Sequence, residues 1–115
     1  MDERLEKAVE FSNYMVTLDN QKRILKEQYY ESLIYYFNKG QFTISQELIS
    51  FLQSLNSMNQ TEAILIDDNE LPIHIEDLKL FIIEVTHKFF AAGNKYLNEY
   101  NKLAESRSVK GLINL

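Results

Sequence analysis

Apolar residues recur at steps of three and four along two long stretches of the chain, about residues 2–38 and about residues 76–105. This spacing places them on one side of a helix, so we predict two long helices that pack antiparallel. The stripe of the first helix comprises Ala8, Phe11, Met15, Leu18, Leu25, Tyr29 and Tyr36, with the polar residues Lys22 and Ser32 at the two intervening places. The stripe of the second comprises Leu78, Phe81, Val85, Phe89, Ala92, Tyr96, Tyr100 and Leu103.

The first long helix has one point at which it could divide. Thr17 or Asp19 could cap a new helix. No glycine or proline forces a break there, so we favour one continuous helix through Thr17–Asn20. Gly40 is predicted to end this helix, because glycine readily adopts the left-handed conformation found at helix C-termini.

A short strand and a shorter helix are predicted next. Apolar and polar residues alternate along Phe42–Ile44, and the segment contains β-favouring residue types, which indicates a strand. Ser45 is predicted to cap a helix over about residues 46–58. In the alternative, Thr43 is the cap and Gln46 is its capping-box partner.

Two apolar runs, Ala63–Ile66 and Leu71–Ile75, flank the polar segment Asp67–Glu70 and predict a β-hairpin. A four-residue loop pairs Ile66 with Leu71, and the alternation of a strand then places one apolar set on the core face. That set is Ile64, Ile66, Leu71 and Ile73. Pro72 lacks an amide donor and suits an edge strand or a non-hydrogen-bonded position.

These elements predict one α+β, mostly helical domain over residues 1–105. It contains a long antiparallel helix pair, a shorter helix, and a small antiparallel β-hairpin or three-stranded sheet at one end. Residues 106–115 are predicted to form a flexible C-terminal tail. The tail ends in Leu112, Ile113 and Leu115, which either fray, as termini do, or bind a protein partner as a short apolar plug.

Composition limits the cellular compartments and the binding partners that fit this 115-residue chain. Cysteine is absent, which excludes disulfides and thiolate metal sites and fits a reducing cytoplasm. No apolar run approaches a membrane span, and the charged N-terminus does not resemble a signal peptide. Residues 45–84 hold one basic and eight acidic residues (−7), whereas residues 85–115 hold five basic and two acidic (+3). The middle of the chain therefore repels nucleic acid and anionic membrane, and only the C-terminal end could bind nucleic acid weakly.

Few residues are candidates for metal binding, catalysis or stacking on bases. The acidic run Asp67–Glu70 could offer oxygen ligands to calcium or magnesium, but its spacing does not match a calcium loop, and these residue types favour a turn. His74 and His87 lack a third ligand at metal-binding spacing. The tyrosine pairs Tyr29-Tyr30 and Tyr35-Tyr36 could stack on bases, but they are also typical of a core rim. We therefore expect no catalytic residue, cofactor or metal.

Four strings of the sequence resemble a family of small proteins from contractile-tailed phages of marine cyanobacteria. The strings are Arg4-Leu5-Glu6-Lys7-Ala8, Gln21-Lys22-Arg23-Ile24-Leu25-Lys26-Glu27-Gln28, Ile66-Asp67-Asp68-Asn69 and Pro72-Ile73-His74-Ile75-Glu76-Asp77-Leu78. The resemblance covers nearly the whole chain and implies a small phage protein made in a bacterial host cytoplasm. It implies no activity.

The function that we expect is a non-enzymatic protein–protein interaction module, a phage accessory factor acting on host or phage transcription or replication machinery. The first alternative is a virion or assembly component that self-associates through the long helices. The second is a weak nucleic-acid-binding protein that uses the basic C-terminal end.

Overall fold

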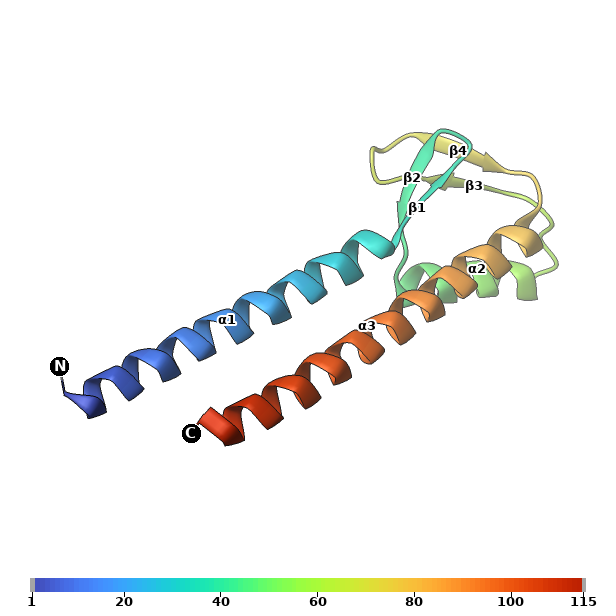
Figure 1. Cartoon of the computed structure of the whole chain (residues 1–115). Coiled ribbons are helices and arrows are strands. Elements are labelled where there is room, and N and C mark those ends of the chain that lie inside the picture. Colours follow the sequence, from blue (N-terminus) through green and yellow to red (C-terminus); the bar gives the residue numbers. More distant parts are fainter. Residues whose placement is uncertain (1, 115) are drawn as a thin grey trace. The chain divides into compact units, whose positions relative to one another are not determined.

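A computed structural model describes the backbone of residues 2–114 and the side chains of residues 2–106. The fold is α+β and mostly helical, as predicted, with a long helix pair, a shorter helix and two antiparallel two-stranded sheets. The elements, labelled in Figure 1, are α1 (Glu3–Ser32), β1 (Ile34–Phe37), β2 (Gly40–Thr43), α2 (Gln46–Ser57), β3 (Ala63–Ile66), β4 (Pro72–Ile75) and α3 (Leu78–Asn114). They form two compact units, one of residues 30–94 and one of residues 1–29 with 95–115.

In the unit of residues 1–29 and 95–115, α1 runs antiparallel to the last part of α3. The ring centroids of Tyr29 and Tyr96 lie 5.0 Å apart. Further along the pair, side chains from both helices line a hollow of ≈ 200 Å³, namely Gln21, Ile24, Leu25, Glu99 and Leu103. α1 is continuous through Thr17–Asn20, as predicted. Among the described side chains of this unit none is buried, so the pair has a seam but no closed core.

The first hairpin, β1–β2, replaces the predicted end of the first helix. α1 ends at Ser32, and Phe37 pairs with Gly40 across a two-residue loop. Asn38 and Lys39 form the loop with φ values of 49° and 69°, as a type I′ turn requires. The prediction of a helix through Asn38 is wrong, because residues 34–37 are aromatic and β-branched types that favour a strand.

Gly40 has a different role from the one predicted. No glycine among the described residues has a positive φ, so Gly40 does not provide a left-handed helix end. A β-carbon at Gly40 would instead lie 2.6 Å from Cγ1 of Ile73. Glycine is needed because the first hairpin passes directly over a core side chain of the second.

The second hairpin, β3–β4, forms one residue out of the predicted register. Leu65 lies opposite Ile73, and Ile64 lies opposite His74. Leu65 is 6% exposed, whereas Ile64 is 62% exposed. The predicted core set, Ile64, Ile66, Leu71 and Ile73, is therefore wrong except for Ile73. A shift of one residue exchanges the two faces of a strand.

The loop of this hairpin explains the shift. The Asp67 N–H donates to the Leu71 carbonyl at 2.9 Å, and the Glu70 N–H donates to the Asp67 carbonyl at 3.0 Å. Glu70 has a φ of 63°, and a left-handed residue after a type I turn closes a three-residue hairpin loop. Because glutamate rather than glycine occupies that position, the sequence does not signal the shorter loop.

The same acidic run covers the outer edge of β2. Oδ2 of Asp67 accepts a hydrogen bond from the Gln41 N–H at 3.0 Å, and Oδ1 of Asp68 accepts one from the Thr43 N–H at 3.2 Å. The Asp68 N–H donates to the Gln41 carbonyl at 2.8 Å. An uncovered strand edge would present unpaired backbone groups. The run is thus a turn, as predicted, and it also joins the two hairpins.

The core of the unit formed by residues 30–94 lies between the hairpins, α2 and the first part of α3. Ser45 caps α2 as predicted, since its side chain accepts the Leu48 N–H at 3.1 Å. Asp77 caps α3 by accepting the Leu80 N–H at 3.1 Å. Phe81 of α3 contacts the rings of the first hairpin at centroid distances of 5.3–5.8 Å. The buried apolar residues are Leu33, Phe42, Ile44, Leu52, Leu65, Ile73, Ile75, Leu78, Phe81, Val85 and Ala92.

α3 is helical through Asn114 and so extends beyond Glu105, where the sequence analysis ends it. No proline interrupts residues 106–114. The side chains of residues 107–115 lie outside the described ones.

Candidate functional site

Within residues 78–94, α3 is apolar on two opposite sides. One side carries buried residues that pack in the core, namely Leu78, Phe81, Val85 and Ala92. The other carries exposed residues, namely Leu80, Ile83, His87 and Phe90, which we call the outer face of α3. With 3.6 residues per turn the two sets point in opposite directions.

The outer face of α3 has the spacing of a helix-docking surface. Its residues follow steps of three, four and three, as at the contact positions of paired helices. Ile83 is 55% exposed and Phe90 is 62% exposed. A soluble helix whose core side is already complete usually has a polar outer side. Exposed large apolar side chains that follow one another along a helix are typical of surfaces that other proteins contact.

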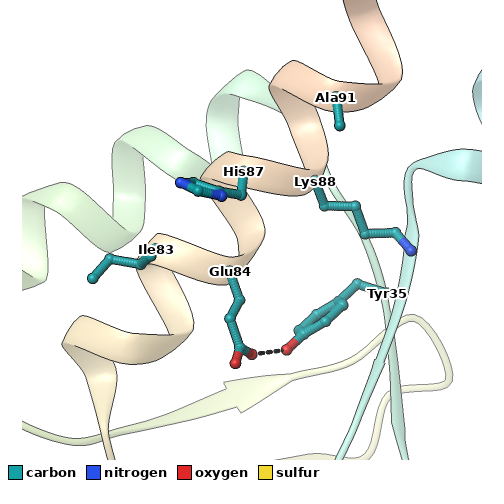
Figure 2. Close-up of a pocket in the computed structure, with 6 residues that line it drawn as sticks. All are labelled: Tyr35, Ile83, Glu84, His87, Lys88 and Ala91. Carbon is teal, nitrogen blue, oxygen red and sulfur yellow. Dashed lines mark hydrogen bonds between the residues drawn. The ribbon is translucent and has the colours of Figure 1, made fainter. Parts of the chain in front are cut away.

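A hollow of ≈ 600 Å³ opens beside this outer face (Figure 2). Its lining residues come from β1 and α3, namely Tyr35, Ile83, Glu84, His87, Lys88 and Ala91. Ile83 and His87 therefore belong both to the outer face and to the hollow. Such a hollow can receive a side chain of a helix that lies along α3.

A hydrogen bond between two elements holds one wall of the hollow. The Tyr35 hydroxyl donates to the Glu84 carboxylate, joining β1 to α3 (Figure 2). Burial, the hydrogen bond to Glu84 and the negative charge of Glu84 together raise the pKa of Tyr35 to about 12. Tyr35 therefore remains a neutral donor at physiological pH, and we assign this pair a structural role.

The residues that the sequence analysis weighed as metal ligands and rejected, Asp67–Glu70, His74 and His87, do not form one cluster. Among the described residues no group of three histidine or acidic side chains is placed to hold a metal ion. His74 lies 3.3 Å from a carboxylate oxygen of Glu62, whereas His87 lies on α3 at the hollow. The oxygens of Asp67 and Asp68 accept hydrogen bonds from backbone N–H groups.

Among the helices of the described residues, none combines the length and the apolar character that a membrane span requires.

The tyrosine pairs lie on two different elements, and the side chains of the C-terminal binding candidates are outside the described ones. Tyr35 and Tyr36 lie on β1 and not on a helix, so the four tyrosines do not form one helical stacking surface. Leu112, Ile113 and Leu115 lie outside the residues whose side chains are described, and their role in partner binding stays a prediction.

The outer face of α3 was missed by the sequence analysis, although its signal is present in the sequence. The spacing search followed the stripe that begins Leu78, Phe81 and Val85. A second stripe, Leu80, Ile83 and Phe90, lies two residues out of phase with it. Periodicity alone does not state which of two apolar stripes faces the core.

We compared the chain with protein-family models, curated proteins and solved structures, and none of them matches.

Proposed function

We propose that the protein is a non-enzymatic protein–protein interaction module that binds an amphipathic helix of its partner along the outer face of α3. The observation that carries the proposal is the exposure of Leu80, Ile83 and Phe90 at helix-pairing spacing, opposite a complete core face. A helix in an apolar surface, with anchors three and four residues apart, is a recurring mode of recognition.

The energy available fits a reversible contact. Fully burying a large apolar side chain contributes about 1.5–3 kcal/mol. Three side chains that are already half buried therefore supply roughly 3 kcal/mol, and a side chain inserted into the hollow by the partner adds to this. Aromatic anchors such as Phe90 usually carry a large share of such binding energy.

The experiment is affinity capture from a lysate of the cells that make the protein, with three purified baits. They are the wild type, the Ile83→Glu/Phe90→Glu variant, and a Tyr36→Glu control, which places one negative charge, against two in the double variant, on an exposed side chain of β1. We expect one defined polypeptide to be retained by the wild type and the control, and its retention to fall at least tenfold with the double variant. Equal retention by all three baits, or no retained polypeptide, would contradict the proposal.

Self-association through the long helices is the second candidate. It is favoured by α1, which has no buried residue and carries exposed apolar side chains, namely Leu5, Val9, Phe11, Met15, Val16 and Ile24. Light scattering over a concentration series tests it, because a self-associating component gains mass with concentration. The phage setting and the action on transcription or replication machinery stay predictions.

A further inference from the structure

The outward side of the β3–β4 hairpin is apolar, although the other side already packs in the core. Ile64 lies opposite His74, and Ile66 lies opposite Pro72. Ile64 and Ile66 are 62% and 64% exposed, and Leu71 at the end of the loop is half exposed. An antiparallel sheet with one buried face normally carries polar residues on the other. We call Ile64, Ile66 and Leu71 the hairpin patch.

Acidic residues flank the hairpin patch along the chain, and the imidazole of His74 lies 3.3 Å from a carboxylate oxygen of one of them, Glu62. Glu62 precedes β3, Asp68 and Glu70 lie in the loop, and Glu76 follows β4. No lysine or arginine occurs anywhere in residues 40–78. Residues 30–94 as a whole contain nine acidic and three basic residues, a balance of −6. A segment that binds here gains from carrying positive charge.

A hollow at one end of β4 offers a place for that charge. It has a volume of ≈ 380 Å³ and is lined by Phe37, Asn38, His74, Glu76 and Asp77. The Asn38 side-chain amide donates to the His74 carbonyl at 3.4 Å and joins the two hairpins at this wall. Glu76 and Asp77 supply two carboxylates, which match an ammonium or a guanidinium group. His74 lies directly across the strand pair from Ile64, so the hollow adjoins the hairpin patch.

We propose that the hairpin patch is a second docking surface, and that its occupant is a basic segment of a partner protein in which aliphatic residues alternate with lysine or arginine. The aliphatic side chains cover Ile64 and Ile66, and one cationic side chain enters the hollow between Glu76 and Asp77. The surface is separate from the outer face of α3 and does not depend on the function proposed for that face.

A pair of synthetic peptides tests the occupant. The basic peptide is a ten-residue sequence of alternating valine and arginine, and the acidic peptide has glutamate in place of every arginine. We expect the basic peptide alone to bind the full-length protein, as measured by fluorescence anisotropy. Binding of the acidic peptide with equal affinity, or of neither peptide, would overturn the proposal.

Matched variants test the place. Ile64→Glu adds negative charge, so attraction by charge alone would tighten the binding of the basic peptide, whereas loss of the patch weakens it. We expect a decrease in affinity of at least tenfold with Ile64→Glu. The control Ile83→Glu adds the same charge on the outer face of α3 and should not weaken binding.

Two further variants test the same site in case Ile64→Glu perturbs the fold. Ile66→Ser removes the apolar contact without a change in charge, and Glu76→Gln removes one carboxylate of the hollow. Each should weaken the basic peptide by about threefold or more. If all three variants bind it as the wild type does, the peptide is held elsewhere and the hairpin patch is not its site. If Ile83→Glu is the only variant that weakens binding, the basic peptide binds on the outer face of α3. That result would leave the proposed function standing and would exclude the hairpin patch as a docking surface.

Discussion

Asp67 connects the loop of the second hairpin to the first hairpin through one carboxylate. One carboxylate oxygen accepts the N–H groups of Asn69 and Leu71 at 3.0 and 2.8 Å, and the other accepts the N–H of Gln41 at 3.0 Å. Hydrogen bonds from the backbone of Gln41 and of Leu71 lower the pKa of Asp67 below its ordinary value of 3.8. The charged form is thus part of the folded structure.

Replacement of Asp67 by asparagine should destabilise the protein in a pH-dependent way. Asparagine can still accept hydrogen bonds within the loop, but its amide group would present a donor to the Gln41 N–H. A folded-state pKa below the ordinary value gives stability that is present above the ordinary pKa and is lost as pH falls through the folded pKa. In urea denaturation, we expect the deficit of Asp67→Asn to be constant at neutral pH and to shrink below about pH 4. A deficit that does not change with pH would exclude this role for the carboxylate.

Leu65 and Ile64 test the hairpin register, because they are neighbours on opposite faces of β3. Leu65→Asp buries a charge without a partner and should cost several kcal/mol in the free energy of unfolding. Ile64→Asp changes an exposed position and should cost no more than about 0.5 kcal/mol. The reverse order would restore the register that the sequence alone predicts.

At the scale of elements, the turn between β1 and β2 is the feature that most separates this fold from a plain helical bundle. Lys39 holds a φ of 69°, a conformation that is unfavourable for a residue with a β-carbon. Lys39→Gly should raise the free energy of unfolding by about 0.5–1 kcal/mol. In a continuous helix the same change would lower it by about 1 kcal/mol. The sign of the change therefore decides between a turn and a helix, and Lys39→Val, expected to destabilise, is the control.

The elements show what the sequence could predict. Long periodic stripes identified the helices, and Ser45 and the flanking polar residues placed α2 correctly, because these signals are local. Residues 33–37 satisfy both a helical stripe and a strand, so their conformation is decided by the turn at Asn38 and Lys39. The register of the second hairpin depends on the left-handed conformation of Glu70. Glutamate rarely adopts this conformation, so the residue type does not predict it.

The candidate site was harder to predict than the fold. The sequence contains both stripes of α3, but the choice of the core stripe depends on where Phe81 meets the rings of the first hairpin. The hollow beside Tyr35 is formed by residues about 50 positions apart in the chain. Contacts of that kind come from tertiary packing and have no local signal.

At the scale of the whole molecule, burial is confined to one unit. Every buried residue among the described side chains lies within residues 30–94, and none lies in residues 2–29 or 95–106. Native-state hydrogen exchange should therefore find the most protected amides in the hairpins, in α2 and in the first part of α3. Amides of residues 3–29 should open at least about 2 kcal/mol more easily. Equal protection of α1 at low protein concentration would contradict this distribution of stability, and protection that grows with concentration would favour self-association.

The central claim is that the outer face of α3 binds a partner protein, and crosslinking inside living cells tests it most directly. The photoreactive residue benzoylphenylalanine would replace Phe90 on the outer face and, as the control, Tyr36 on β1, since both are exposed aromatic residues. The account predicts that illumination joins the protein to one defined polypeptide from position 90 and not from position 36. No crosslinked product from position 90, or the same products from both positions, would contradict it.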